Sequence, residues 1–570
     1  MRLLNCRTLG FEEFVGYVPA YAILSHTWGE GEITFSDMSN RESASSKYGM
    51  EKIEATCRVA LEEGLDYAWV DTCCIDKSSS AELSEAINTM FAWYKGAALC
   101  LVFLSDFLAF PSSTLAEIVA SFDAREASEK REQVFHRDPH ILTGREIELR
   151  RTVRNSLGSC KWFSRGWTLQ ELIAPSRVQF YDKNWTCFGS KAELSSVLAW
   201  ITGIDASVLN GRSLDEILVG RRMSWIANRS TTRVEDMAYC LLGIFDINMP
   251  LLYGEGKKAF IRLQEEILRS NHDFSLFAWK PDPDEERRFR GLMADSPARF
   301  KGCGRLVKPT FEWDNGGEYS LTNRGLRTEG LVRIGRGMGD EVGSYFLSLD
   351  CVDERRNKDV LVVSLRQYGP GLFARRRHSA IFDLNVYSST KLPQPQYICC
   401  KDSLALEDMV IASRVNAVQI VFSDDVFDIE SVTTFPQADW DLRNSMLLSF
   451  QRPHFWGMWT VNTHNEDGGI SIVCVRSSDW LLYGIFASRK LPRALRRDGL
   501  LPSHVEDILQ GLPDRTSVEC SGFVHTVKDE QVHLGEAGVA TLLRVYSTEI
   551  KRKQSHSKLR RIRSFLRRND

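Results

Sequence analysis

Short apolar runs alternate with amphipathic stretches over the first 200 residues of the chain. The apolar runs are predicted to be buried strands at residues 21–24, 67–70, 99–104 and 178–181. Between the first two, residues 50–63 place their apolar side chains on one helical face, and Gly64 follows as a stop signal. A second helix is predicted after Ser79, because Ser79 and Glu82 have the spacing of a capping box. This alternation predicts an α/β domain with a parallel sheet and crossover helices.

The sequence pattern divides the chain into four predicted regions. We expect an α/β domain over residues 1–200 with its core at about 20–180, interrupted by a charge-dense, solvated insertion at 121–160. The regions that follow are predicted to be a helical extension at 201–295, a β-rich domain of unknown role at 300–548, and a basic tail at 549–570.

Composition and charge argue against several classes of protein, among them nucleic-acid-binding and membrane-spanning proteins. Hydrophobic residues make up 43% and charged residues 26% of 570 residues, which is ordinary for a globular protein. The formal charge of −3 gives no electrostatic case for specific binding of nucleic acid. The longest apolar run, residues 97–104, is far shorter than the ~18 residues of a transmembrane helix. No C-x-x-C pair or secretion signal is visible, so we expect a cytoplasmic protein without a metal site.

Polar side chains follow the predicted strands at the point where each strand ends. Ser25, His26 and Trp28 follow the first strand. Asp71 and Asp76 follow the second, and Ser105 follows the third. The carboxyl ends of parallel strands share one edge of a sheet, where ligands bind in open α/β folds. These residues are therefore candidate substrate-binding residues, although Asp and Ser also commonly cap the helices that come next.

The densest cluster of candidate chemistry lies between Cys160 and Pro175. Trp167 and Glu171 are four residues apart and share one face of a helix that begins near Trp167. A carboxylate beside an aromatic ring is partly desolvated, which raises its pKa, and the ring offers a face to a flat or cationic group. The alternative is a core tryptophan, with Glu171 in an ion pair with Arg165 or Arg177.

Three motifs occur in order along the chain: Y-A-I-L-S-H-T-W-G from Tyr21, W-V-D-T-C-C-I-D-K-S-S-S from Trp69, and W-F-S-R-G-W-T-L-Q-E-L-I-A-P from Trp162. The succession closely resembles the heterokaryon-incompatibility (HET) domain of filamentous fungi. Two further blocks, at 221–245 and 249–267, resemble the helical extension that often follows this domain. The family is associated with programmed cell death after fusion of genetically different hyphae, a form of non-self recognition.

The HET domain is in turn similar to TIR domains, which implies a TIR-like parallel sheet flanked by helices. The stretch W-T-L-Q-E-L resembles the TIR pattern W-C-x-x-E-L, with Thr168 in place of the cysteine. Enzymatic TIR domains cleave the nicotinamide–ribose bond of NAD through the glutamate of that pattern. The resemblance therefore implies Glu171 as the catalytic residue and NAD as a substrate rather than a bound cofactor. Trp28 or Trp167 could stack on a flat ring, and Arg165 could pair with pyrophosphate.

Two functions remain open on the sequence alone. One is a cell-death effector that acts as an NAD glycohydrolase. The other is a non-enzymatic signalling or adaptor module that self-associates or recruits partners, because TIR-like folds serve both. In either case we expect an unidentified protein trigger and homo-oligomerisation on activation. A further expectation is that the C-terminal half restrains the domain, so that a chain ending near Trp200 is more toxic than the whole.

Overall fold

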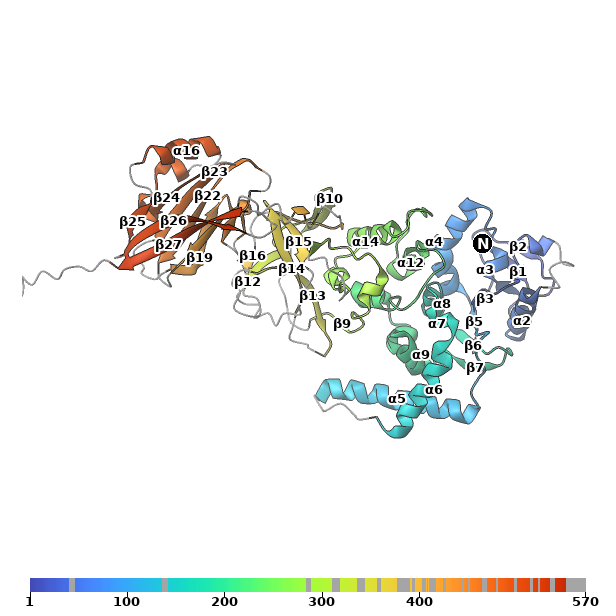
Figure 1. Cartoon of the computed structure of the whole chain (residues 1–570). Coiled ribbons are helices and arrows are strands. Elements are labelled where there is room, and N and C mark those ends of the chain that lie inside the picture. The colour runs from blue at the N-terminus through green and yellow to red at the C-terminus, as the bar shows by residue number, and fades with distance from the viewer. Residues whose placement is uncertain are drawn as a thin grey trace, which may run out of the picture.

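A seven-stranded sheet forms the centre of the N-terminal domain (Figure 1). The computed structural model describes residues 1–39, 47–135, 142–282, 289–309 and most of 318–549, and residues 550–570 of the expected basic tail lie outside this part. The strands of the sheet are β1 (Arg2–Asn5), β2 (Phe11–Glu13), β3 (Tyr21–His26), β4 (Tyr67–Trp69), β5 (Leu99–Phe103), β6 (Val178–Tyr181) and β7 (Cys187–Ser190). The four strands predicted from the apolar runs are thus present.

The order and direction of these strands create a topological switch point at one edge of the sheet. The spatial order is β2-β1-β4-β3-β5-β6-β7, and β4, β3, β5 and β6 run parallel. The predicted parallel sheet is therefore confirmed. From β3 the chain crosses to β4, whereas from β5 it crosses to β6 on the other side. The carboxyl ends of β3 and β5 consequently form a topological switch point, which is where doubly wound sheets bind ligands.

Helices cover both faces of the sheet. The helices around it are α2 (Tyr48–Glu62), α3 (Asp71–Cys74), α4 (Ser80–Gly96), α7 (Lys161–Ser164) and α8 (Thr168–Ile173). Right-handed crossovers in opposite directions place α2 on one face and α4 with α8 on the other, in agreement with Figure 1. Helix α4 begins as the sequence predicts, because the Ser79 side chain accepts a hydrogen bond from the backbone N–H of Glu82 at 3.3 Å.

The charge-dense segment between β5 and β6 is mostly helical. It contains α5 (Ser112–Phe135) and α6 (Gly144–Asn155), and both pack near α9 (Ser195–Thr202) in Figure 1. Phe122 of α5 meets Trp200 of α9 edge-to-face with ring centroids 5.4 Å apart, and the Arg150 guanidinium lies 4.4 Å from the Phe122 centroid. These aromatic and cation–π contacts fasten the pair of helices to the domain.

The helical extension packs directly on the N-terminal domain. Its helices are α10 (Ala206–Leu209), α11 (Val219–Ser224), α12 (Asp236–Tyr239), α13 (Leu242–Phe245) and α14 (Lys258–Ser270). Gly243 of α13 approaches α4 so closely that a Cβ there would lie 2.1 Å from the Cβ of Phe91. The backbone N–H of Met249 also donates to the side-chain oxygen of Asn88 at 3.4 Å. The extension and the sheet domain therefore share one hydrophobic core.

The β-rich region contains two units. The strands of the first are β8 (Phe289–Arg290), β9 (Leu306–Val307), β10 (Tyr319–Thr322), β11 (Gly325–Thr328), β12 (Val332–Gly335), β13 (Ser344–Asp353), β14 (Val360–Gly369), β15 (Leu372–Arg376), β16 (Thr390–Lys391) and β17 (Gln396–Ile398). This sheet belongs to the same core as the helical extension. Its Arg375 donates to the carbonyls of Phe277 at 2.9 Å and Trp279 at 2.5 Å, which ties β15 to the extension.

The second unit is a sandwich of a six-stranded and a four-stranded sheet with its own core. Its elements are β18 (Val418–Phe422), β19 (Phe427–Phe435), β20 (Trp440–Asp441), β21 (Met446–Leu447), β22 (His454–Thr463), β23 (Gly469–Ser477), β24 (Leu481–Ala487), α16 (Pro502–Gln510), β25 (Ser517–Cys520), β26 (Phe523–His533) and β27 (Val539–Glu549). Helix α16 packs on the four-stranded sheet.

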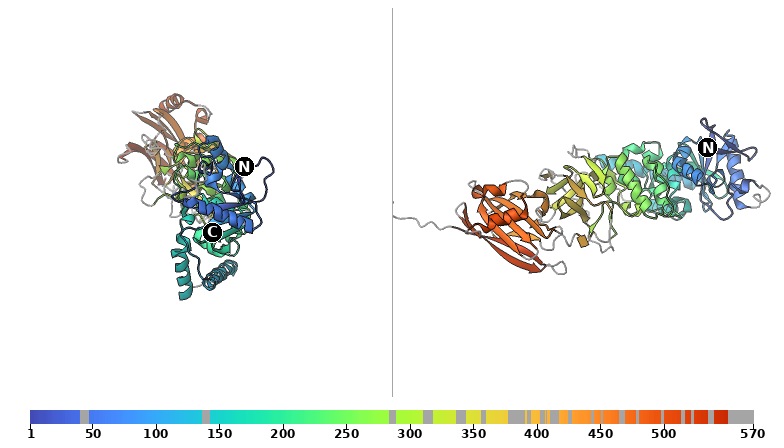
Figure 2. Two further views of the ribbon diagram at one scale, coloured as in Figure 1. Left: turned by 90° about the vertical axis from the view of Figure 1, so that its right-hand side faces the viewer. Right: turned by 90° about the horizontal axis from the view of Figure 1, so that it is seen from above.

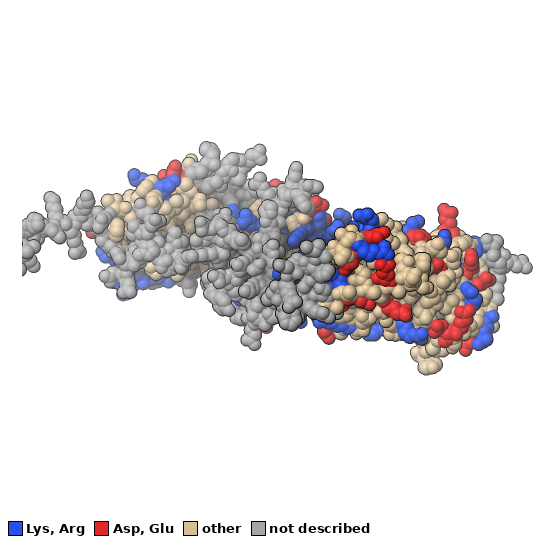
Figure 3. Space-filling model, turned by 90° about the horizontal axis from the view of Figure 1, so that it is seen from below, with Lys and Arg blue, Asp and Glu red and all other residues tan. Residues whose placement is uncertain are grey.

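The parts of the chain follow one another in a row from the sheet domain to the sandwich (Figure 2). On the face drawn in Figure 3, acidic and basic side chains are interspersed over the N-terminal half, as the near-neutral composition suggests. No helix within the described ranges combines the length and the apolar character that spanning a membrane requires.

Candidate active site

A buried hydrogen-bonded group lies at the switch point of the sheet. The Ser25 hydroxyl, at the end of β3, donates to the Glu171 carboxylate at 2.5 Å. The Trp162 indole N–H donates to the Ser25 hydroxyl oxygen at 2.8 Å. Ser25 and Trp162 are fully buried, and Glu171 is 8% exposed. We call these three residues the Ser25–Glu171–Trp162 group; it joins residues that the sequence places far apart.

The surrounding elements hold this group in place. All six residues of β3 are buried, as is typical of a central parallel strand. Helix α8 is buried along its whole length, and the Lys191 ammonium donates to the carbonyls of Leu172 at 3.2 Å and of Pro175. The Tyr94 hydroxyl of α4 donates to the Leu24 carbonyl at 3.0 Å, next to Ser25. Both the strand and the short helix are thus fixed at the ends that carry the group.

Burial controls the charge of Glu171. Desolvation raises the pKa of this carboxyl from its ordinary value of 4.5 to about 8. The hydrogen bond from Ser25 opposes the rise, and the negative charge of Asp71 adds to it. The positive charges of Arg165 and Arg229 also lower the pKa of Glu171. Glu171 is therefore mostly neutral at pH 7. A cation bound close to it would lower its pKa and favour the carboxylate form.

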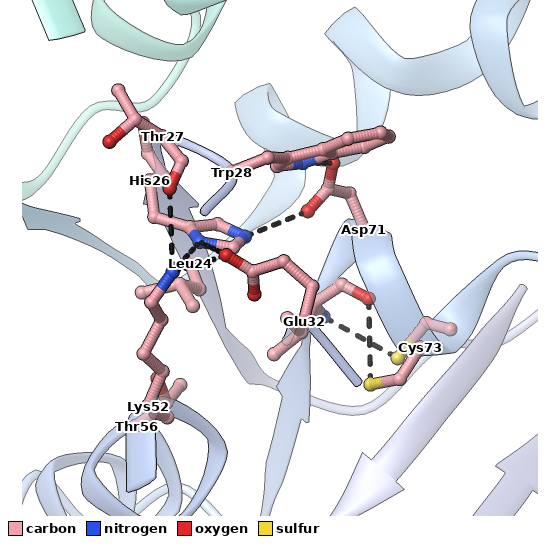
Figure 4. Close-up of polar contacts among 12 residues, drawn as sticks. Leu24, His26, Thr27, Trp28, Glu32, Lys52, Thr56, Asp71 and Cys73 are labelled. Atoms are coloured by element: carbon pink, nitrogen blue, oxygen red, sulfur yellow. Dashed lines mark hydrogen bonds and ion pairs between the residues drawn. The ribbon is translucent and has the colours of Figure 1, made fainter. Parts of the chain in front are cut away.

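A second polar group surrounds His26 (Figure 4). It lies on the face of β3 opposite to Ser25, because successive side chains of a strand alternate. The His26 Nε2 lies 3.1 Å from an Asp71 carboxylate oxygen, and its Nδ1 lies 3.2 Å from the Lys52 ammonium. Lys52 also forms an ion pair with Glu32. An ammonium only donates, so Nδ1 of His26 accepts and its Nε2–H faces Asp71. Both ring nitrogens are thereby occupied, which argues against His26 as a general base.

Asp71 is held ionised by this network. Burial alone would raise its pKa, but hydrogen bonds from His26 and Trp28, together with the positive charge of Lys77, outweigh burial and lower the pKa to about 2. The Trp28 indole N–H donates to Asp71 at 2.8 Å. Asp71 thus links the strand end to the loop that carries Trp28.

The Trp28 ring is a half-exposed aromatic surface near the strand ends. It is 47% exposed, and the Lys77 ammonium lies 3.6 Å from its ring centroid. The Arg165 guanidinium lies 5.9 Å from the same centroid. A half-exposed ring with two cations nearby offers a stacking surface to a flat group and positive charge to phosphate oxygens. The positive charge of Arg165 also lowers the pKa of Glu171, so Arg165 links this surface electrostatically to the Ser25–Glu171–Trp162 group.

Other predicted site residues lie apart from this arrangement. Asp76 accepts hydrogen bonds from the backbone and hydroxyl of Ser78, which is a local turn role. Ser105 is exposed at the end of β5. Trp167 is half-buried at the start of α8, four residues before Glu171, and the indole N–H of Trp162 reaches the Ser25 hydroxyl that binds Glu171. For the alternative ion pairs, Arg177 pairs with Glu63, and Ser25 supplies the hydrogen bond to Glu171.

Sequence reasoning did not find several residues that complete the site. Trp162 stands within the third motif, but nothing in its spacing distinguishes it from Trp167. Lys52 meets His26 through the packing of α2 against β3, and Glu32 reaches the His26 ring from the loop that follows β3. Arg229 comes from the helical extension, about 60 residues after Glu171, and no periodicity points to it.

The described residues do not form a cluster of metal-binding side chains. No group of three or more His, Cys, Asp or Glu side chains in the described part of the chain is arranged to bind one. A separate polar pocket of about 350 Å³ lies where the helical extension meets the first β unit, and none of the predicted site residues lines it. Chemically, the arrangement at the switch point provides one buried carboxylate, a hydroxyl bound to it, and an adjoining aromatic and cationic surface.

Comparison with known proteins agrees with the motifs. Residues 21–171 match the family described as heterokaryon incompatibility protein (HET), and residues 258–306 match a domain of unknown function, DUF8212. The vegetative incompatibility protein HET-E-1 of Podospora anserina is 44% identical to the chain over 314 residues, which are 54% of this chain and 20% of that protein. The chain thus spans about a fifth of that relative's length.

The similarity to this relative covers 314 residues, more than the segment that matches the HET family. The comparison with solved structures found no significant match. The chain therefore carries a HET domain over residues 21–171 and is similar over 314 residues to a fungal vegetative incompatibility protein.

Proposed function

We propose that the chain is an effector of vegetative incompatibility whose HET domain cleaves the nicotinamide–ribose bond of NAD through Glu171. The observation that carries this proposal is the position of the Ser25–Glu171–Trp162 group at the switch point of a parallel sheet. The relative named as a vegetative incompatibility protein supports the biological role. The TIR-like character of the domain is part of the same proposal.

The reaction needs a carboxylate more than a general acid. Heterolysis of the C–N bond leaves its electron pair on nicotinamide, which departs as a neutral molecule, and positive charge develops on the ribose ring. Ionised Glu171 stabilises that oxocarbenium character. Water then adds to the ribose carbon and releases a proton, which gives ADP-ribose. The cationic nicotinamide ring itself favours the ionised form of Glu171 when it is bound, because opposite charges attract in a desolvated site.

The surface around Trp28 suits the remainder of the substrate. Its half-exposed ring can stack on a base, and Lys77 over the ring and Arg165 nearby can pair with the pyrophosphate. Access to Glu171 requires movement of the side chains that cover it, since it is 8% exposed. Assembly of several copies, triggered by another protein, would supply such a rearrangement.

The same burial favours a second candidate function. A carboxyl this well covered also fits a structural role in a non-enzymatic module that signals by self-association. Expression in fungal cells separates the two. Loss of NAD and of viability with the wild-type chain, and of neither with Glu171→Gln, would support the enzyme. Toxicity that survives Glu171→Gln with unchanged NAD would support the module. Glu148→Gln, on the exposed face of α6, is the matched control.

A further inference from the structure

The side chain of Arg229, from the helical extension, is inserted beneath the start of α8. It is 7% exposed, and its Nη1 donates to the Arg165 carbonyl at 2.9 Å and to the Thr168 hydroxyl oxygen at 2.8 Å. The next residue pairs with the same segment through its backbone: the N–H of Gly166 donates to the Ser230 carbonyl at 2.8 Å, and the N–H of Ser230 donates to the Ser164 carbonyl at 2.7 Å. The extension thus binds the motif that carries Glu171 through both side-chain and backbone hydrogen bonds.

Hydrogen bonds lead from Arg229 to Glu171 through Thr168, the backbone and indole ring of Trp162, and Ser25. The Thr168 hydroxyl that accepts from Arg229 donates to the Trp162 carbonyl at 2.5 Å. The Trp162 indole N–H then donates to Ser25, which donates to Glu171. Thr168 also lies three residues before Glu171 on α8, so the two share a face of the helix. Thr168 is the position where the TIR pattern has cysteine, and its hydroxyl is what binds Arg229.

Arg229 also brings positive charge to the site. Its Nη2 is buried and has no hydrogen-bond partner among the described residues. Burial lowers the pKa of Arg229 to about 10, so the guanidinium remains cationic at neutral pH. A buried cation without a full set of partners is costly, and a nearby carboxylate offsets that cost. The titratable groups that act on Glu171 or are acted on by it are Asp71, Tyr94, Cys100, Arg165, Arg229 and Cys240.

We infer that Arg229 is a positioning residue for the Glu171 site, which fixes Thr168 and Trp162 through direct and relayed hydrogen bonds and supplies a buried positive charge from outside the matched HET segment. The functional unit is therefore the HET domain together with the helical extension. This inference deepens the proposed NAD cleavage, and its activity readout rests on that proposal.

The test uses the full chain with three variants. Arg229→Met removes the charge and the hydrogen bonds. Arg229→Lys keeps the charge but loses the planar set of N–H donors of the guanidinium. Thr168→Val removes only the hydroxyl that links Arg229 to Trp162. Arg212→Met, an exposed arginine of the same extension, is the control. Nicotinamide release is measured against pH. The indole N–H resonance of Trp162, assigned with Trp162→Phe, reports ionisation of Glu171 through Ser25 in NMR spectra.

The expected result is a fall in kcat of about 10- to 100-fold for Arg229→Met with little change in KM, since a misplaced catalytic group costs this much. The indole titration should also move to higher pH, because a positive charge near the carboxylate is lost. Arg229→Lys should restore the titration but not the full rate. Thr168→Val should lower kcat while its titration stays near that of the wild type.

Opposite results overturn the inference. A folded Arg229→Met with unchanged kcat and an unchanged indole titration would show that Arg229 is merely structural. If that variant does not fold, Arg229→Lys and Thr168→Val decide by the same criteria. If the wild type releases no nicotinamide, the proposed function fails, and the indole titration alone decides the role of Arg229.

Discussion

The Ser25 hydroxyl and the Glu171 carboxylate are joined by a 2.5 Å hydrogen bond, although 146 residues separate them along the chain. One residue ends the first parallel strand, and the other lies on a short helix that precedes the last. The bond therefore exists only in the assembled sheet, and it brings the first and third motifs of the HET domain to one point.

Replacement of Glu171 by Gln should stabilise the protein at alkaline pH. The folded-state pKa of about 8 exceeds the ordinary 4.5, so the contribution of the carboxyl is fully present below about pH 4.5 and is lost as the pH rises through about 8. Glutamine has no charge to bury and still accepts from Ser25. At pH 9 Glu171→Gln should raise the free energy of unfolding by up to about 5 kcal/mol relative to its effect at pH 4.5.

Urea unfolding of both proteins at the two pH values measures this difference. A difference that does not change with pH would mean that Glu171 ionises normally. Glu148→Gln should show no such dependence, because Glu148 is exposed.

The pH profile of NAD cleavage should rise toward alkaline pH. The profile of kcat/KM reports the free enzyme, so it should be half-maximal near pH 8, where Glu171 ionises. The profile of kcat should be half-maximal at lower pH, since the cationic nicotinamide ring favours the carboxylate in the complex. Initial rates of nicotinamide release between pH 6 and 9 give both curves. A kcat/KM that falls over this range would contradict the role of Glu171 as an anion.

Gly166, in the third motif, should not tolerate a side chain. A Cβ at this position would lie 2.6 Å from the Thr231 methyl carbon and 3.2 Å from the Cys240 sulfur. Gly166→Ala should therefore cost about 1–3 kcal/mol of stability through overpacking, measured by thermal unfolding. Adding Thr231→Ser removes the offending methyl group and should recover part of the loss. Equal stability of the single and double variants would show that the contact is relieved elsewhere.

A truncated chain should fold only if it keeps the hydrophobic core that the HET domain shares with the helical extension. A chain that ends at Trp200 is cut inside α9 and lacks the contacts of Arg229, Ser230 and Gly243. We expect it to unfold, whereas the sequence alone led us to expect a fragment more toxic than the whole chain. A chain that ends at Met409 keeps the first core and should melt cooperatively.

Circular dichroism melting curves of the two fragments distinguish these outcomes. Toxicity from the fragment that ends at Trp200, at equal expression, would restore the idea that the C-terminal half restrains the domain. Loss of the cooperative transition in the longer fragment would mean that the sandwich stabilises the rest.

The sequence predicted the strands and α4 because their signals are local. Leu99–Phe103 is a continuous apolar run, and the cap of Ser79 lies three residues from its partner. The strand ends also pointed correctly to Ser25, His26 and Asp71 as neighbours of one edge. The sequence placed Trp162 and Trp167 in one dense cluster, but nothing in their spacing indicated that Trp162 is the residue that binds Ser25. The contribution of Arg229 depends on how the extension docks, which no spacing within the motifs encodes.

Nicotinamide release from NAD by the purified full chain tests the central claim most directly. Wild type, Glu171→Gln and Glu148→Gln are compared at high protein concentration and at pH 8.5, where Glu171 is mostly ionised. The account predicts nicotinamide and ADP-ribose in equal amounts from the wild type and from Glu148→Gln, and neither product from folded Glu171→Gln. Equal release by wild type and Glu171→Gln, or no release by any of the three, would contradict it.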